Sequence, residues 1–229
     1  NAMIGYISGT NLVGGLVGYN TSGTITNCYN AMIGYISGTN LVGGLVGDNR
    51  GIIENCYNAM NGSISSNSSS SYTGYVGGLV GYNNGEIRNC YNAMIGSISG
   101  TNYVGGLVGS NSSNGEIINC YNAMIGDISG DDWVGGLVGL NHGSNGQIRN
   151  CYNAMNGSIS GNDLVGGLVG ANYSGGFITN CYNAMVGDIS GTDNNLVGSG
   201  SSTNCYATDG WDDSAAFTND ILLNDSLVW

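Results

Sequence analysis

Residues 92–121 read NAMIGSISGTNYVGGLVGSNSSNGEIINCY, and the chain repeats this unit along most of its length. The cysteine near the end of each unit marks the period. The cysteines, Cys28, Cys56, Cys90, Cys120, Cys151, Cys181 and Cys205, are separated by 28, 34, 30, 31, 30 and 24 residues. A period near 30 residues without a run of helix-forming residues indicates one solenoid coil per repeat.

Each unit contains three apolar stretches of strand length, for example 94–99, 103–108 and 116–121. Glycine and asparagine gather between them, where the backbone bends at little cost. We therefore expect three short strands per coil and about seven coils of roughly 30 residues, with like strands about 4.8 Å apart. The predicted fold is an all-β, right-handed parallel β-helix, because parallel connections are right-handed almost without exception.

The repeat covers residues 1–206, and residues 207–229 depart from it. Apolar residues such as Trp211, Phe217 and Leu222 gather in this last segment, so we expect it to cap the same domain. The chain opens on Asn1, Ala2 and Met3, which match the NAM of later repeats. We therefore expect further coils or another domain before residue 1.

The composition excludes several classes of protein. The 229 residues include 43 glycines, three basic residues, one histidine and 15 acidic residues, for a net charge of −12. Nucleic acid is excluded as a partner, because its phosphates require many cations. No apolar run reaches the roughly 18 residues of a membrane span, so we expect none in this segment.

Three residue types recur at one position in every unit, and we expect each to form a file along the stack. Asparagines precede the cysteines and are expected to hydrogen-bond one another: Asn27, Asn55, Asn89, Asn119, Asn150, Asn180 and Asn204. The cysteines are read as buried free thiols, with disulfides or metal ligation as alternatives. Tyrosines follow them and either stack for stability or form an adhesive strip: Tyr29, Tyr57, Tyr91, Tyr121, Tyr152, Tyr182 and Tyr206.

Core packing is assigned to the valines and leucines of VGGLVG. The paired glycines in that stretch either permit a bend or let the opposite wall approach closely.

Two positions vary between units, and variable positions are the better candidates for ligand contact. We expect both to face solvent. One comprises Tyr6, Tyr35, Ser63, Ser97, Asp127, Ser158 and Asp188, and the other Tyr19, Asp48, Tyr82, Ser110, Leu140 and Ala171. The candidate ligand-contact residues are their four tyrosines, Tyr6, Tyr35, Tyr19 and Tyr82.

No catalytic, cofactor-binding or metal-binding residue is predicted. Arg50, Arg88 and Arg149 fall in separate units, and His142 stands alone in a loop. A polysaccharide-cleaving β-helix needs converging carboxylates or a calcium ion with a basic residue. Acidic residues toward the C-terminal half, such as Asp131 and Asp163, suggest Ca²⁺ only as an alternative to an ordinary solvated surface.

The stretch LVGGLVGYN followed by GTITNCYN, with its copies, resembles the GLUG motif, which is named for its G-L-x-G core. The resemblance covers about residues 1–206. It implies a scaffolding or adhesive part of a bacterial surface protein, such as an adhesin or the non-catalytic region of an immunoglobulin A peptidase, and it supplies no catalytic residues.

The sequence therefore predicts a structural or adhesive module, extracellular or on the bacterial cell surface, acting as a rigid stalk or a ligand-binding scaffold. Expected partners are a host or environmental glycan or protein, or adjoining domains of the same protein. The alternatives are a fibre subunit that associates end to end and a polysaccharide-active enzyme.

Overall fold

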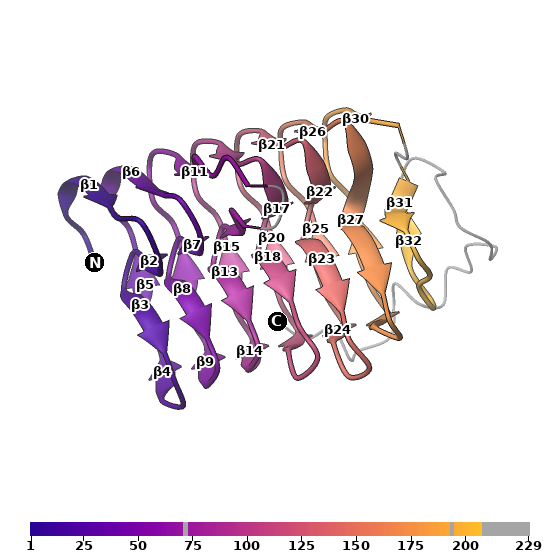
Figure 1. Ribbon diagram of the computed structural model, residues 1–229, viewed down its shortest axis with the longest axis horizontal. Coiled ribbons are helices and arrows are strands. Elements are labelled where there is room, and N and C mark those ends of the chain that lie inside the picture. The colour runs from indigo at the N-terminus through magenta and orange to yellow at the C-terminus, as the bar shows by residue number, and fades with distance from the viewer. Residues whose placement is uncertain (71–72, 193–194, 208–229) are drawn as a thin grey trace.

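The computed structural model describes residues 1–70, 73–192 and 195–207. These residues contain no helix, and so none that could cross a lipid bilayer. Their strands stack as a β-solenoid of about six turns, close to the expected seven coils (Figure 1). The final unit is shorter, and its described residues contain no strand that pairs with Phe177–Thr179. Of the predicted cap, residues 207–229, only Ala207 is among the described residues.

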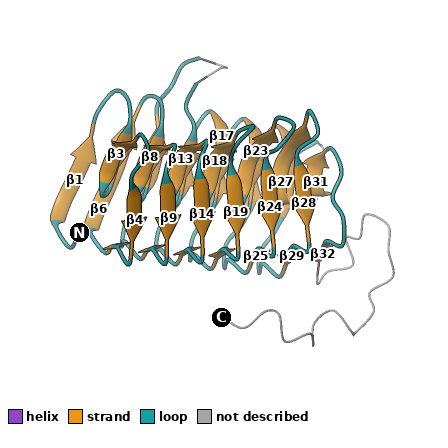
Figure 2. Cartoon of the chain, turned by 90° about the horizontal axis from the view of Figure 1, so that it is seen from below, coloured by secondary structure: helices purple, strands orange, loops and turns teal. Residues whose placement is uncertain are grey.

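Four parallel sheets run along the solenoid, and each coil adds strands to them (Figure 2). Sheet A contains β1 (Ile4–Ser8), β6 (Ile33–Gly38), β11 (Ile64–Ser66), β16 (Ile98–Ser99), β21 (Ile128–Ser129), β26 (Ile159–Ser160) and β30 (Ile189–Ser190). Sheet C contains β4 (Thr24–Thr26), β9 (Ile52–Glu54), β14 (Glu86–Arg88), β19 (Glu116–Ile118), β24 (Gln147–Arg149) and β28 (Phe177–Thr179). Sheet D contains β5 (Tyr29–Asn30), β10 (Tyr57–Asn58), β15 (Tyr91–Asn92), β20 (Tyr121–Asn122), β25 (Tyr152–Asn153), β29 (Tyr182–Asn183) and β32 (Tyr206–Ala207).

Sheet B has two arms that follow each other along the chain. The first arm contains β2 (Val13–Gly14), β7 (Val42–Gly43), β12 (Val76–Gly77), β17 (Asn102–Gly105) and β22 (Asp132–Gly135). The second contains β3 (Val17–Asn20), β8 (Val46–Asn49), β13 (Val80–Asn83), β18 (Val108–Asn111) and β23 (Val138–His142). The long strand β27 (Asp163–Tyr173) spans both arms, and β31 (Asn195–Ser199) pairs with it.

The expectation of three strands per coil is wrong, because two of the three apolar stretches divide. The stretch 103–108 splits at its paired glycines into β17 and β18. The stretch 116–121 splits into β19 and β20 at Asn119, whose φ of 53° places it in the left-handed region. Asparagine tolerates that region better than most residues, so it forms the corner between sheets C and D.

The paired glycines serve both of the roles considered for them. A Cβ on Gly105 would lie 2.1 Å from the Val108 carbonyl oxygen, so the first glycine allows the tight bend between the arms. A Cβ on Gly106 would lie 2.3 Å from Nδ2 of Asn122, so the second lets the opposite wall approach. The coil is therefore pinched between sheets B and D.

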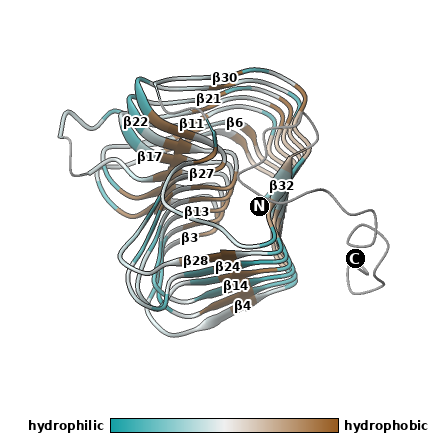
Figure 3. Ribbon diagram, turned by 90° about the vertical axis from the view of Figure 1, so that its right-hand side faces the viewer, coloured by the Kyte–Doolittle hydropathy of each residue, from teal (hydrophilic) through white to brown (hydrophobic). Residues whose placement is uncertain are grey.

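This pinch divides the interior into two apolar clusters. One contains the methionines of NAM, the isoleucines of sheet A and the valines of the first arm of sheet B. The other contains the leucines and valines around the second arm, the isoleucines of sheet C and the cysteines. Figure 3 shows the superposed coils end-on, with apolar residues in brown. Identical positions pair across coils, as in Val104 with Val134 and Ile87 with Ile117, so both clusters continue along the solenoid.

Candidate functional site

The cysteines lie in one file on the inner side of the corner between sheets C and D. All are free thiols; Cys28 is partly exposed and the others are buried. The backbone N–H of Cys56 lies 3.4 Å from Sγ of Cys90 on the next coil, and the Cys120 thiol donates to the Ile118 carbonyl over 3.2 Å. Burial raises the pKa of the Cys120, Cys151 and Cys181 thiols, which disfavours the thiolate needed to react or to bind a metal.

The tyrosines after the cysteines stack outside the same corner. The rings of Tyr57, Tyr91, Tyr121 and Tyr152 follow one another with centroids 4.9 Å apart and interplanar angles of 2° to 4°. Each ring therefore covers the face of the next ring. Because the faces are occupied, this file offers ring edges to solvent, which counts against its use as a stacking platform for sugars.

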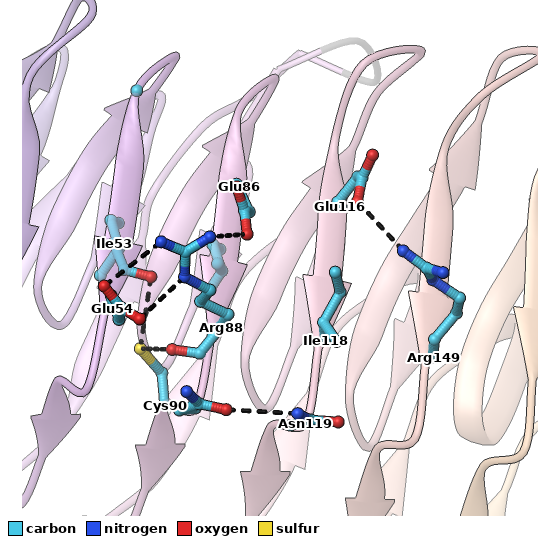
Figure 4. Close-up of polar contacts among 12 residues, drawn as sticks. Ile53, Glu54, Glu86, Arg88, Cys90, Glu116, Ile118, Asn119 and Arg149 are labelled. Carbon is cyan, nitrogen blue, oxygen red and sulfur yellow. Dashed lines mark hydrogen bonds and ion pairs between the residues drawn. The ribbon is translucent and has the colours of Figure 1, made fainter.

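The asparagines before the cysteines are joined by their side chains from coil to coil. The Nδ2 of Asn119 donates to Oδ1 of Asn89 on the preceding coil over 3.3 Å (Figure 4). Asn150 in turn donates to Oδ1 of Asn119 over 3.2 Å. The same bond links Asn180 to Asn150 and Asn204 to Asn180. The file secures the C–D corner at the positions where the backbone has positive φ.

Two further asparagine files, both buried, were missed by the sequence reasoning. One follows the tyrosines: Asn30, Asn58, Asn92, Asn122, Asn153 and Asn183. In it Asn122 donates to the Gly136 carbonyl over 2.9 Å and to Oδ1 of Asn153 over 3.1 Å. The other ends the second arm of sheet B: Asn20, Asn49, Asn83, Asn111, Asn141 and Asn172. Their recurrence after CY and after VGx in six units was the available signal.

The first variable column lies on sheet A and is exposed at its tyrosines. Tyr6 and Tyr35 stack with centroids 5.3 Å apart and are 62% and 51% exposed. Tyr19 and Tyr82 belong to sheet B instead, on β3 and β13. The four candidate tyrosines therefore form no single site.

The second variable column does not face solvent throughout, which corrects the expectation. Asp48, Ser110 and Ala171 are buried, whereas Tyr19 is exposed. The reason is the fold of sheet B: a Cβ on Gly109 would lie 2.8 Å from the Tyr103 carbonyl oxygen, so the two arms approach each other on their outer side. The line where the two arms meet is a seam on the outside of sheet B. A short side chain in this seam is covered by the longer side chains beside it.

Aromatic side chains fill part of this seam. The rings of Tyr75, Tyr103 and Trp133 stack with centroids 4.5 and 4.6 Å apart, and Tyr82 meets Tyr75 edge-on at 5.9 Å. Tyr103 is buried, and burial raises the pKa of Tyr75 to about 12. The seam is therefore a packed aromatic cluster.

All three arginines lie beside carboxylates. Arg88 contacts Glu54 at 2.9 Å and also pairs with Glu86, and Arg149 pairs with Glu116 at 3.2 Å on the outer face of sheet C (Figure 4). Arg50 contacts Asp48 at 3.3 Å and lies over the Tyr19 ring. Burial raises the pKa of Asp48, and Arg50 opposes that shift.

The remaining titratable candidates do not converge on a shared centre. His142 is partly buried in β23, where desolvation lowers its pKa. Burial raises the pKa of Asp132, and the nearby Asp163 and Asp131 add to that shift. Within residues 1–70, 73–192 and 195–207, no three His, Cys, Asp or Glu side chains form a group that could hold a metal ion.

Comparison with known families identifies the repeat. Residues 9–32, 72–99 and 100–129 match the family described as the GLUG motif. The chain contains GLUG repeats. Each matched stretch includes strands from both arms of sheet B, so the G-L-V-G core of a GLUG repeat corresponds to the pinch and the bend. No curated protein and no solved structure matches the chain. The GLUG repeats and the β-solenoid fold fit a structural repeat module.

Proposed function

We propose that this module is a rigid spacer in a bacterial cell-surface or secreted protein, holding adjoining domains or a receptor-contacting region at a distance. One observation supports the proposal above others. The residues that recur in every coil bond or stack with their own copies on neighbouring coils, as in the asparagine and tyrosine files. Their hydrogen bonds and ring contacts run along the solenoid axis and hold neighbouring coils together. A rigid spacer needs its cohesion along that axis. The occurrence of GLUG repeats in bacterial surface proteins supports the location.

The spacer function can be tested by pulling single molecules between their two ends. A rigid spacer should keep its length up to a threshold force and then lose whole coils. Each lost coil of about 30 residues should release roughly 100 Å of chain, at up to about 3.6 Å per residue. Continuous lengthening from the lowest forces would contradict the proposal, because it would mean that the coils do not cohere.

Adhesion is the second candidate function, and exposed tyrosines favour it. Tyr6, Tyr35 and Tyr19 are the most exposed of the four candidate contact residues, and aromatic side chains are common anchors in binding surfaces. A glycan array probed with the protein distinguishes adhesion from spacing. Binding that is lost in Tyr35→Ala but kept in Tyr91→Ala would assign an adhesive surface to sheet A. Equal loss in both variants would contradict that assignment.

We also propose that the chain has no catalytic function. GLUG repeats are in general non-catalytic. The basic residues that a polysaccharide-cleaving site would need are paired with Asp48, Glu54, Glu86 and Glu116. Release of reducing sugar from any polysaccharide incubated with the purified chain would overturn the proposal.

A further inference from the structure

Asparagine is followed directly by glycine at five places in the chain. An asparagine in this setting can lose its side-chain amide without an enzyme, because glycine has no side chain to hinder the approach of its backbone nitrogen to the asparagine Cγ. The five pairs consist of the same two residues, so a difference in their reactivity comes from the fold. They begin at Asn61, Asn84, Asn114, Asn145 and Asn156.

Two of the pairs are held by hydrogen bonds between coils. Asn61 is exposed, but the N–H of Gly62 donates to the Ile95 carbonyl on the next coil over 2.7 Å. The equivalent bond after Asn156 is 2.9 Å long. A nitrogen that donates in this way cannot turn toward the asparagine side chain until neighbouring coils separate. Both asparagines are therefore protected in the folded chain.

The next two asparagines restrain each other through their side chains. Asn84 is partly buried, and its Oδ1 accepts from Nδ2 of Asn114 over 3.2 Å and from the Ser112 hydroxyl over 2.8 Å. The N–H of Gly115 donates within its own turn to the Ser112 carbonyl over 2.8 Å. Both amides are therefore fixed at the corner between sheets B and C.

The pair Asn145-Gly146 is the least restrained of the five. It lies between β23 and β24, outside both strands, and Asn145 is exposed. The Asn145 side chain makes no hydrogen bond to any residue that the structure describes. The N–H of Gly146 donates over 3.2 Å to the Gly143 carbonyl of the same turn. Because a surface turn can open without separating the sheets, this nitrogen is free to attack.

We infer that Asn145 is a site of spontaneous deamidation, with water as the co-reactant. The Gly146 nitrogen bonds to Cγ of Asn145 and gives its proton to solvent, while Nδ2 takes up a proton and leaves as ammonia. The product is a succinimide ring. Water then adds to one of the two ring carbonyls. Aspartate forms when the new C–N bond breaks, and isoaspartate forms when the original peptide bond breaks.

The fold can accommodate either product. The connection between sheets B and C already differs in length between coils, from residues 84–85 to residues 143–146. Isoaspartate adds one methylene group to the main chain, which a loop of variable length absorbs at little cost. The solenoid therefore stays folded, and each event adds one negative charge to the net charge of −12. The inference does not depend on the proposed spacer function.

Ageing the whole folded chain at pH 8 and about 37 °C for several days tests the inference. Tandem mass spectrometry of its peptides locates each new aspartate or isoaspartate. Asn145 should convert at least about tenfold faster than Asn61 and Asn156, whose reaction waits for coils to separate. In concentrated urea the five pairs should convert at similar rates. Asn61 keeping pace with Asn145 in the folded chain would overturn the inference, as would an unchanged Asn145 while the chain in urea converts.

Two matched variants assign the early charge change to one residue. Asn145→Gln keeps an amide in the exposed turn but places a further carbon between it and the backbone, which disfavours closure of the ring. Isoelectric focusing of the aged folded chain should show at least about tenfold less of the first acidic species in this variant. Asn156→Gln, also at an exposed position, should leave that species unchanged. Equal losses in the two variants, or no loss in Asn145→Gln, would contradict the assignment.

Discussion

Asparagine side chains add bonds between coils to those of the parallel sheets, because the amide both donates and accepts. A file of identical amides can hydrogen-bond from coil to coil, each Nδ2 to the next Oδ1, which an apolar or acidic side chain cannot do. Asn122 adds a bond across the pinch to the Gly136 carbonyl. The buried asparagines therefore donate hydrogen bonds to backbone carbonyls of sheet B, such as that of Gly136.

We predict that Asn122→Leu lowers the free energy of unfolding by about 2 to 6 kcal/mol, since it leaves the Gly136 carbonyl and the Asn153 side-chain oxygen unsatisfied at about 1 to 3 kcal/mol each. Urea denaturation followed by circular dichroism measures the change. Asn145→Leu, in an exposed loop, is the matched control and should change stability by less than about 0.5 kcal/mol. Similar losses in the two variants would show that the buried amide is dispensable.

Glycine at the pinch is equally constrained. Gly106→Ala should prevent folding or lower the midpoint of urea unfolding severely, because its Cβ would lie 2.1 Å from the Gly136 carbonyl oxygen as well as against Asn122. Gly9→Ala is the matched control. There the new Cβ meets only a valine methyl at 3.2 Å, and stability should be unchanged or slightly higher. Normal stability of Gly106→Ala would contradict the pinch.

At the scale of the elements, sequence periodicity predicted the parallel sheets and their register but not their number. It located Val104, Leu107 and Cys120 at inward positions, because apolar recurrence reports burial directly. Periodicity missed two divisions in each coil, one at the asparagine before the cysteine, such as Asn119, and one at the paired glycines. A corner within an apolar stretch leaves the hydropathy pattern unbroken. The inward asparagines were missed for a related reason, since alternation was read from apolar residues alone.

The buried cysteine file makes a prediction about reactivity. In the folded protein at pH 8, iodoacetamide should modify Cys28 and spare the six buried thiols, because alkylation requires an accessible thiolate. In concentrated urea all seven should react. Intact mass spectrometry counts the modified thiols. Rapid modification of Cys120 without denaturant would mean that the file is open to solvent.

The same file makes stability depend on pH. Burial raises the pKa of Cys120, Cys151 and Cys181 in the folded state, so the unfolded chain releases these protons first. Their contribution is fully present below the ordinary thiol pKa of about 8.5 and is lost as pH rises above it, by up to about 1.4 kcal/mol per unit for each thiol. Urea midpoints between pH 8 and 10 should fall, and less steeply in Cys120→Ala. A flat profile would contradict the burial of the thiols.

At the scale of the whole molecule, the stack should tolerate loss of a complete coil. Removing residues 91–120 joins Cys90 to Tyr121, which restores the CY sequence of every other repeat. Because each coil contacts only its neighbours, the shortened chain should keep its β-sheet circular dichroism spectrum and become shorter by about 4.8 Å. Small-angle X-ray scattering measures the length. Collapse into an unfolded chain would show that the coils are not equivalent.

The central claim is that like positions on successive coils lie directly above one another. Pulsed electron spin resonance tests it with pairs of nitroxide labels in the first variable column, in a background with Cys28→Ser. Labels at Ser63 and Asp127, Ser63 and Ser158, and Ser63 and Asp188 are two, three and four coils apart. Backbone separations of about 10, 14 and 19 Å are expected, rising by about 4.8 Å per coil. Distances that do not increase by equal steps along this series would contradict the stacked solenoid.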